Sequence, residues 1–573
     1  MPIPARAYNA AVGGHVCGPD DIDFGQKVVH LIKYDRDGNE VSFESQVTKA
    51  NKIYVIHDDF TLSSNVTIPA NCVLEFDGGS INCSNYVITG NKMPTNVVYT
   101  PEQFGAGKTS DDTKAIQTAV NLCNYVKMDG IYNVYANTNN FDNGSISVPS
   151  NTTIYMNGTI NYKTDNLDTY SIFVLDEVSN VNIVGNGKYV GDKLFHVGST
   201  GEWGHGICII HSDHIIINGG EFYNFWGDGI YCGHAKGANT QINISNVNIH
   251  DFRRQGISIC SGSHIIISDS NISSNDSESY GSIQHSIDVE THNALYPISN
   301  ITIKNTNVYN ILVYGQQTLQ NKFEHIRIEN VNLNSALRAY DLFTNCIISN
   351  CIIPRLDLTY GGDTYTTGNI SNFYDCIITL LCADSVAKFY NCQINGVITN
   401  YDIDRGNERI ELYNSILDLL GTDINTNGFR NSGNISFYFL GCKFINRNYI
   451  DVIYVRNLHF ENCTLDFYAN ICSKFEAKNC IIYARLEVDW TSDYVIYADD
   501  LTLYNCTIII TSEKTWPLYR LNRAVGGVYN PLINEGSVVI DAISGRTKTY
   551  GSNNTLYDVG TIYIGNHVQQ YTN

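Results

Sequence analysis

The segment INISNVNIHDFRRQGISICSGSHIII, residues 242–267, holds one repeat of a pattern that recurs through the middle of the chain. Its two ends belong to a series of three-residue apolar strands: VNI at 181, III at 215, INI at 242, III at 265, ITI at 301 and IRI at 326. Between them lies GIS at 256, which belongs to a second series with GIC at 206, GIY at 229 and SID at 286. Internal repetition is therefore the dominant signal in the sequence.

Short strands, Asn- and Gly-rich turns and insertions of variable length are typical of a right-handed parallel β-helix. One coil cannot bury its apolar face alone, so successive coils stack into a solenoid. A β-sandwich is the alternative fold, but its strands would not repeat one motif so closely in phase. We therefore predict an all-β protein whose parallel β-helix spans residues 101–525.

The composition favours this class and argues against several kinds of partner. The chain has 573 residues, and its 39 Tyr, 46 Gly and low charged fraction of 16% favour strands over helices. Its net charge of −21 argues against nucleic acid or an anionic membrane as the main partner. The sequence contains no apolar run of membrane-spanning length, so we expect no membrane insertion.

The N-terminus and the cysteines indicate folding in a reducing compartment. The opening segment MPIPARAYNAAVGGHVCGPDD lacks the apolar core of a signal peptide, so we expect no signal peptide. Seven of the 17 cysteines recur in one frame, each before a short apolar strand, and we interpret them as an interior ladder of free thiols. They are Cys351, Cys376, Cys392, Cys442, Cys463, Cys480 and Cys506. Zinc-site spacing is absent from the sequence, and we expect no cofactor.

A short helix is predicted just before the repeats begin. In FGAGKTSDDTKAIQTAVNLC, residues 104–123, Ser110, Asp111 or Asp112 can cap a helix with one apolar face. We place this capping helix at residues 111–124 and expect it to cover the apolar end of the solenoid.

Two segments carry a resemblance to known proteins. FGAGKTSDDTKAIQTAV, from residue 104, resembles the opening signature of the pectate-lyase-like β-helix superfamily. KIYVIHDDFTLSSNVTIPANCVLEFDGGSI, residues 52–81, resembles the preceding segment of bacteriophage tailspike-type proteins and related gut-bacterial β-helix proteins. The match by motif covers roughly residues 50–330.

The resemblance implies a domain order and a biological setting. It implies an N-terminal head in residues 1–50 that attaches to a virion, and a β-rich lead-in in residues 51–100. Residues 526–573 would form a C-terminal cap or trimerisation element. A tailspike-like protein would be a homotrimer on the virion tail, assembled in the host cytoplasm, in contact with tail or baseplate proteins and with bacterial surface polysaccharide.

The second series of strands predicts where functional side chains gather. It aligns GHGICII (204–210), GDGIYCG (227–233), RQGISIC (254–260) and QHSIDVE (284–290) on consecutive coils, with equivalent positions about 4.8 Å apart. At the start of the strands this predicts a column of His205, Asp228, Gln255 and His285. An outward column on an exposed face would hold Cys208, Tyr231, Ser258 and Asp288, with Glu290 two residues further on.

Paired carboxyl groups in this pattern point to glycoside hydrolysis, which uses one acid to protonate the leaving oxygen and another to activate water or attack. Asp228 lies two coils, or about 9.6 Å, from Asp288 and Glu290, while these two form a rival pair about 6.6 Å apart along one strand. The predicted catalytic residues are Asp228, Asp288, Glu290, His285 and Arg254. The predicted substrate-binding residues are Arg253, Trp203, Trp226, Tyr231, His205, Gln255 and Tyr280.

Three functions stay open at this point. The layout is similar to that of polygalacturonase-type hydrolases, but Arg254 and Gln255 replace their usual acidic pair, so a tailspike-like depolymerase of bacterial capsular or surface glycan is the leading interpretation. A polysaccharide lyase is the second, with Arg253, Arg254 or calcium neutralising a uronic acid and His285 or Tyr231 acting as base. A non-catalytic adhesin that binds glycan through aromatic rings is the third.

Overall fold

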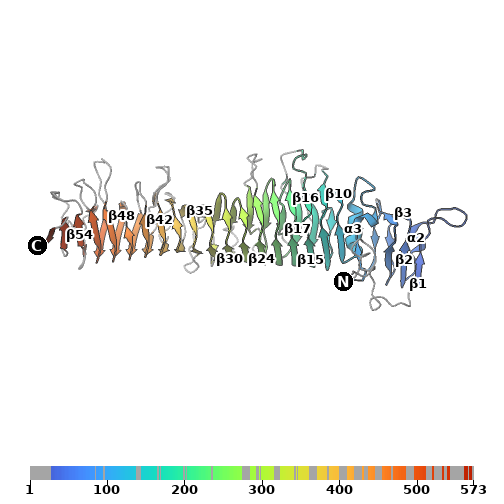
Figure 1. Ribbon diagram of the computed structural model, residues 1–573, viewed down its shortest axis with the longest axis horizontal. Coiled ribbons are helices and arrows are strands. Elements are labelled where there is room, and N and C mark those ends of the chain that lie inside the picture. Colours follow the sequence, from blue (N-terminus) through green and yellow to red (C-terminus); the bar gives the residue numbers. More distant parts are fainter. Residues whose placement is uncertain are drawn as a thin grey trace, which may run out of the picture. The chain divides into compact units, whose positions relative to one another are not determined.

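The computed structural model shows an all-β chain built from short parallel strands (Figure 1). It describes residues 27–83, 85–94, 97–136, 144–163, 167, 169–197, 201, 203–233, 236–273, 284–291, 296, 298–314, 323–340, 343–344, 346–359, 371–383, 386–398, 409–418, 429–430, 436–445, 455–465, 469–484, 496–510, 519–521, 532–533, 538–541, 561–564 and 567–570. The chain divides into two units, residues 1–309 and residues 310–573.

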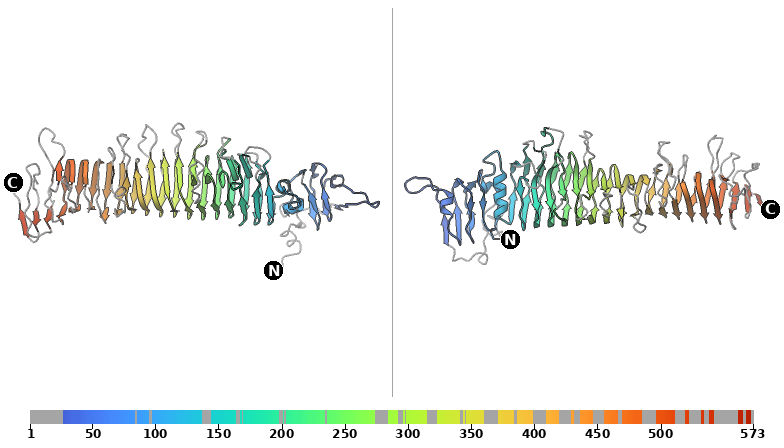
Figure 2. Two further views of the ribbon diagram at one scale, coloured as in Figure 1. Left: turned by 90° about the horizontal axis from the view of Figure 1, so that it is seen from above. Right: turned by 180° about the vertical axis from the view of Figure 1, so that it is seen from behind.

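Each complete coil of the first unit contributes three strands. In one coil these are β21 (Thr240–Ser245), β22 (Asn248–His250) and β23 (Gln255–Ile259). Each pairs in parallel with its counterparts on the neighbouring coils, and Figure 2 shows the stacked strands. For example, β21 lies between β18 (Asp213–Asn218) and β24 (Gly262–Ser268). The predicted right-handed parallel β-helix is confirmed. The two predicted series form the first and third strands of each coil, while the second strand was not predicted.

An isoleucine ladder fills the interior of these coils. Ile215, Ile242, Ile265 and Ile301 occupy paired positions on successive first strands, and all four are buried. Burying one such side chain contributes about 1.5–3 kcal/mol relative to leaving it in water. The ladder explains the repeated motif, because each interior position contacts the same position on the coils above and below.

The Asn-rich turns occupy corners with left-handed backbone. Asn246, Asp269 and Asn305 follow consecutive first strands, with φ values of 55°, 53° and 50°. Asn and Asp tolerate this conformation better than other residues with a side chain. The side chains also stack, since the amide of Asn305 donates to Asp269 Oδ1 at 3.0 Å. The turn composition therefore follows from the backbone that each corner requires.

The predicted helix forms as α3 (Thr113–Leu122), inside the predicted bounds of 111–124. Asp111 Oδ1 accepts a hydrogen bond from the backbone N–H of Thr113, and Lys92 Nζ donates to the carbonyls of Val120 and Cys123 near the other end. The apolar face of α3 is buried. It packs against η1 (Pro101–Phe104), β7 (Ile88–Thr89), β9 (Tyr125–Met128) and β11 (Ile146–Ser147), so it joins the lead-in strands to the first coils.

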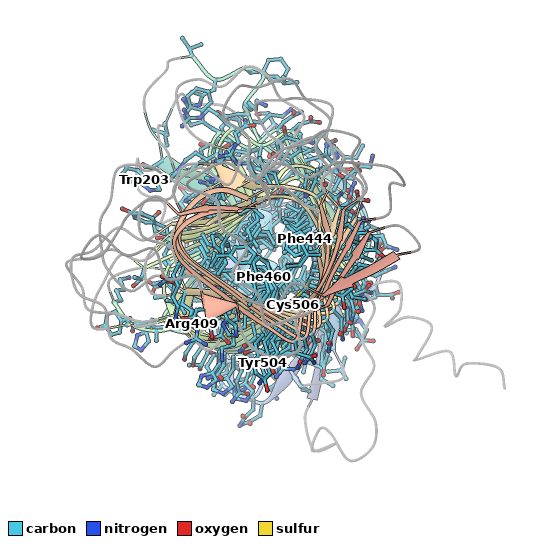
Figure 3. The ribbon with its side chains drawn as sticks, turned by 90° about the vertical axis from the view of Figure 1, so that its left-hand side faces the viewer. Trp203, Arg409, Phe444, Phe460, Tyr504 and Cys506 are labelled. Atoms are coloured by element: carbon cyan, nitrogen blue, oxygen red, sulfur yellow. The ribbon has the colours of Figure 1, made fainter. Side chains whose placement is uncertain are left out.

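The second unit continues the same coil design with different interior residues. All seven cysteines of the predicted ladder are free and buried. Figure 3 shows Cys506, Phe444 and Phe460 inside the coil, and Arg409 and Tyr504 outside it. Near its end, β55 (Thr561–Ile564) and β56 (His567–Gln570) pair antiparallel in a small C-terminal β element. The roles of residues 1–50 and 526–573 stay predictions, and residues 1–26 lie outside the described part of the chain.

The isoleucine ladder yields a stability prediction. Ile265→Ala leaves a cavity between two coils and should lower the free energy of unfolding by about 2–5 kcal/mol. Ile266→Ala is the matched control, because Ile266 follows Ile265 on β24, points outward and is 36% exposed. Chemical denaturation measures both changes, and a control that loses as much stability as Ile265→Ala would contradict the interior ladder.

Candidate functional site

The predicted columns form on the third strands of four consecutive coils. These strands are β17 (Trp203–Ile210), β20 (Ile230–Cys232), β23 and β26 (His285–Glu290). Their register pairs Cys208 with Tyr231, Tyr231 with Ser258 and Ser258 with Asp288. The alignment of the outer column made from the sequence is therefore confirmed at all four of its positions.

The face that carries these residues is covered, which differs from the expectation of an exposed face. Asp288 is only 4% exposed, and Cys208, Tyr231 and Ser258 are also buried. An apolar cluster lies on this side of the sheet and consists of Val174, Cys208, Ile210, Tyr231 and Cys260. A strand buried on both faces carries apolar side chains at successive positions, as the run ICII at 207–210 does.

Asp228 lies just before β20 and is completely buried. Its Oδ2 accepts a hydrogen bond from Ser258 Oγ at 2.8 Å, and its Oδ1 accepts one from the backbone N–H of Gln255 at 3.2 Å. Burial raises the pKa of Asp228, although the charge of Arg254 and the bond from Ser258 act in the opposite direction. The Asp228 carboxyl group therefore keeps its proton to a higher pH than an exposed aspartate does.

His205 is held neutral beside Asp228. Burial, with the charge of Arg254 acting in the same direction, lowers the pKa of His205 to about 3. Its Nδ1 accepts a hydrogen bond from the backbone N–H of Asp228 at 3.1 Å, so the ring proton sits on Nε2. The ring also stacks on Tyr231, with 5.0 Å between centroids.

Gln255 connects Asp228 to His285, which is the last residue of the predicted column at the start of the strands. Gln255 and His285 are paired in register, and Gln255 Oε1 accepts a hydrogen bond from the backbone N–H of His285 at 2.6 Å. Together with the bonds at Asp228, this gives a hydrogen-bonded chain across four coils, from His205 through Asp228 and Gln255 to His285. All four residues are buried.

Arg253 and Trp226 pack against each other inside the protein. The Arg253 guanidinium carbon lies 3.9 Å from the Trp226 ring centroid, and Arg253 also donates to the carbonyls of Trp226 and Gly201. The Trp226 ring stacks on His196 at 3.9 Å. Arg253 and Trp226, both predicted to bind substrate, are buried. The hydrogen bond from Arg253 to the Gly201 carbonyl fixes the backbone two residues before Trp203.

Asp192 and His196 complete this buried group. His196 Nδ1 lies 2.9 Å from Asp192 Oδ2, and Tyr170 donates its hydroxyl to Asp192 Oδ1 at 2.6 Å. Asp192 and His196 belong to an inserted segment outside both strand series. Neither the repeats nor a motif pointed to them.

Three predicted residues are accessible to solvent. Trp203 is 41% exposed, and Glu290 and Arg254 are half-buried. Tyr280 lies outside the described residues. Within the described ranges there is no group of three or more His, Cys, Asp or Glu side chains suited to a metal ion, and no helix long and apolar enough to cross a membrane.

Comparisons with known proteins assign neither a family nor a reaction to the chain. No family model matches the chain. Over 135 residues, 21% of this chain, it is 32% identical to the uncharacterized protein YclG of Bacillus subtilis (strain 168), and the match spans 23% of that protein. The chain thus covers less than a quarter of this curated relative.

Two solved structures illustrate the structural likeness. The tailspike protein of E. coli bacteriophage HK620, in complex with a pentasaccharide, is 10% identical with a TM-score of 0.37, over 71% of this chain and 75% of that chain. The A-module of the mannuronan C-5 epimerase AlgE4 from Azotobacter vinelandii is 12% identical with a TM-score of 0.33, over 74% and 100%. The resemblance to β-helix proteins is confirmed at the level of the fold by the parallel coils themselves.

The buried histidine predicts sensitivity to acid. Between about pH 6.5 and pH 3 the unfolded chain binds a proton that folded His205 does not, so stability falls as the pH falls through this window. At pH 5 this loss amounts to about 2 kcal/mol relative to neutral pH. Urea unfolding at pH 7 and pH 5 should show a smaller loss for His205→Asn than for the wild type. The control His264→Asn, at an exposed position, should behave as the wild type; equal losses in all three proteins would contradict the assignment.

Proposed function

We propose that this chain is a polysaccharide depolymerase that hydrolyses glycosidic bonds of a bacterial capsular or surface glycan, with Asp288 and Glu290 as the reacting carboxyl groups. The observation that carries the proposal is the gathering of three carboxyl groups, Asp228, Asp288 and Glu290, on one side of β20, β23 and β26. Of these, Glu290 is the most exposed to solvent.

The spacing of this pair suits one of the two hydrolytic mechanisms. Asp288 and Glu290 are alternate residues of β26, so their side chains point to the same side and start from Cα atoms about 6.6 Å apart along the strand. Carboxyl groups separated by roughly 6.5–9.5 Å leave room for a water molecule and invert the anomeric carbon. Water arrives from the solvent, so Glu290 is assigned as the base that activates it and Asp288 as the acid that protonates the leaving oxygen.

The remaining residues position this pair. Asp228, His205, Gln255 and His285 are buried and fix β17, β20, β23 and β26 relative to one another through their hydrogen bonds. Arg253 holds Gly201, and thereby Trp203, whose exposed ring offers a flat apolar surface to a sugar. Arg254 is accessible and supplies a cation beside the carboxyl groups.

A non-catalytic glycan-binding adhesin is the second candidate. The burial of Asp228 and Asp288 favours it, because a buried carboxyl group reaches a substrate only after the covering segments move. A lyase mechanism is less well supported, because Arg253 is buried against the Trp226 ring and donates to the Trp226 carbonyl. Of the two arginines, this leaves Arg254 to neutralise a sugar carboxylate. The resemblance to tailspike-type proteins extends the proposal to a homotrimer on a virion tail, with the head in residues 1–50 as its attachment.

The first test replaces the reacting groups. Glu290→Gln and Asp288→Asn should each lower kcat by about a hundredfold or more, because general acid–base groups contribute about 10²–10⁴ in rate. Both variants should keep their affinity for the glycan. The matched control Glu177→Gln changes an exposed carboxylate elsewhere in the first unit and should keep full activity. Release of reducing ends gives the rate, and full activity of Glu290→Gln would reject the assignment.

A second test separates positioning from catalysis at Asp228. Asparagine can keep both contacts there, because its carbonyl accepts from the Gln255 N–H and its amide donates to Ser258 Oγ. We expect Asp228→Asn to keep activity within about tenfold of the wild type, because only a group that transfers a proton in the reaction contributes about 10²–10⁴ in rate. Release of reducing ends gives kcat, and a loss in Asp228→Asn as large as that in Glu290→Gln would make Asp228 the catalytic acid and contradict its positioning role.

A further inference from the structure

The second unit carries a separate group of charged and aromatic side chains on the first strands of four of its coils. These strands are β36 (Ser371–Tyr374), β38 (Ala387–Tyr390), β41 (Arg409–Tyr413) and β44 (Ser436–Leu440). Their register pairs Lys388 with Glu411 and Glu411 with Tyr438. Alternate residues of these strands, such as Phe389 and Leu412, are buried in the interior, so Lys388, Arg409 and Glu411 lie on the outer face. Figure 3 shows Arg409 outside the coil.

Glu411 organises this group, which we call the Glu411 cluster: Lys388, Arg409, Glu411, Tyr413 and Tyr438. Glu411 is only 5% exposed and binds Arg409 Nε at 2.5 Å, Lys388 Nζ at 3.2 Å and the Tyr413 hydroxyl. Two cations therefore surround one carboxylate, and the cluster has a net charge of +1. The side chains of Arg409 and Lys388 are 49% and 26% exposed, so this surplus positive charge faces solvent.

Aromatic rings fix the cluster and extend it along the coils. The Arg409 guanidinium carbon lies 3.8 Å from the centroid of the Tyr438 ring, an arrangement that orients its N–H groups. Beside it, Tyr374, Tyr390 and Tyr413 stack with centroid separations of 4.9 Å and 4.7 Å. Stacked rings turn their edges outward, so this tyrosine stack presents a row of half-exposed phenol groups with the period of the coils.

We propose that the Glu411 cluster and the tyrosine stack bind an acidic polysaccharide, with a sugar carboxylate at Arg409 and Lys388 and the chain running along the stack. Guanidinium and ammonium groups are the donors that carboxylates prefer, and a repeating row of phenol groups suits a repeating polymer. The surplus positive charge stands out in a chain of net charge −21. This binding surface goes beyond the proposed function and does not rest on the site in the first unit.

Two features of the described residues favour this ligand. The outward side chains of β36, β38 and β41 are Asn, Tyr, Lys, Arg and Glu, and those of β44 are Ser436, Tyr438 and Leu440, so all but one are polar or aromatic, which suits a polar polymer better than a protein partner. Within the same unit the Arg327–Glu329 pair balances one cation with one acid, whereas Asp357 binds two cations, Arg338 and Arg355. The feature that favours a polymer is therefore the tyrosine stack that lies beside the two cations of the Glu411 cluster.

The test is affinity electrophoresis and calorimetry of the full chain with three probes: polygalacturonate, alginate and hyaluronan, each also as its neutral carboxyl-reduced form. At least one acidic probe should bind, its reduced form should not, and added salt should weaken the complex. The double variant Lys388→Gln/Arg409→Gln should weaken binding at least about tenfold. Tyr390→Phe keeps the ring stack, loses one hydroxyl and should weaken binding less.

The control Arg327→Gln removes an equally exposed arginine of the same unit and should bind as the wild type. Thermal unfolding of each variant establishes that the fold is intact. Binding of none of the acidic probes, or unchanged binding by the folded double variant, would overturn the proposal. Equal competition by inorganic phosphate would show a general anion site and overturn the saccharide assignment. Glu290→Gln should leave this binding unchanged, which separates it from the proposed function.

Discussion

Parallel stacking of coils in strict register is the constraint on which the rest of the structure depends. Each side chain meets its equivalents on the coils above and below at about 4.8 Å, so a position is defined by a column and not by one residue. Interior columns accept isoleucine, phenylalanine or a thiol, and corner columns accept residues that tolerate a left-handed backbone. Outer columns obey the same rule, as the pairing of Ser258 with Asp288 shows.

Both clusters of interest follow from this constraint. A column brings together groups from successive coils that are distant in the sequence, such as Asp228 and Ser258 or Lys388 and Glu411. In the first unit the column is covered, and a buried polar group is stable only when it is hydrogen-bonded. The hydrogen bonds that link His205, Asp228, Gln255 and His285 meet this need for the Asp228 carboxyl group and the Gln255 side-chain oxygen, and they fix the strands that carry Asp288 and Glu290. In the second unit the column is open, and Glu411 orients cations toward solvent.

The sequence predicted the fold and the columns because both depend on the phase of a repeat. The pairing of Cys208, Tyr231, Ser258 and Asp288 followed from aligning short strands, and the helix over Thr113–Leu122 followed from its caps and its apolar face. Burial of the outer column was missed, although apolar residues at adjacent positions in GICII were a usable signal. Asp192 and His196 were not predicted because they belong to an insertion between the repeated strands. Contacts between an insertion and a distant strand do not recur from coil to coil, so the repeat cannot predict them.

The central claim is that this face hydrolyses a glycan, and the most direct measurement is a digest of purified bacterial capsular and surface polysaccharides by the wild-type chain. Reducing ends and the ultraviolet absorbance of unsaturated products are followed together. Our account predicts new reducing ends without that absorbance. Reducing ends accompanied by the absorbance would mean a lyase and would contradict it. Binding of a glycan without any cleavage would contradict it as well, and would make the chain an adhesin.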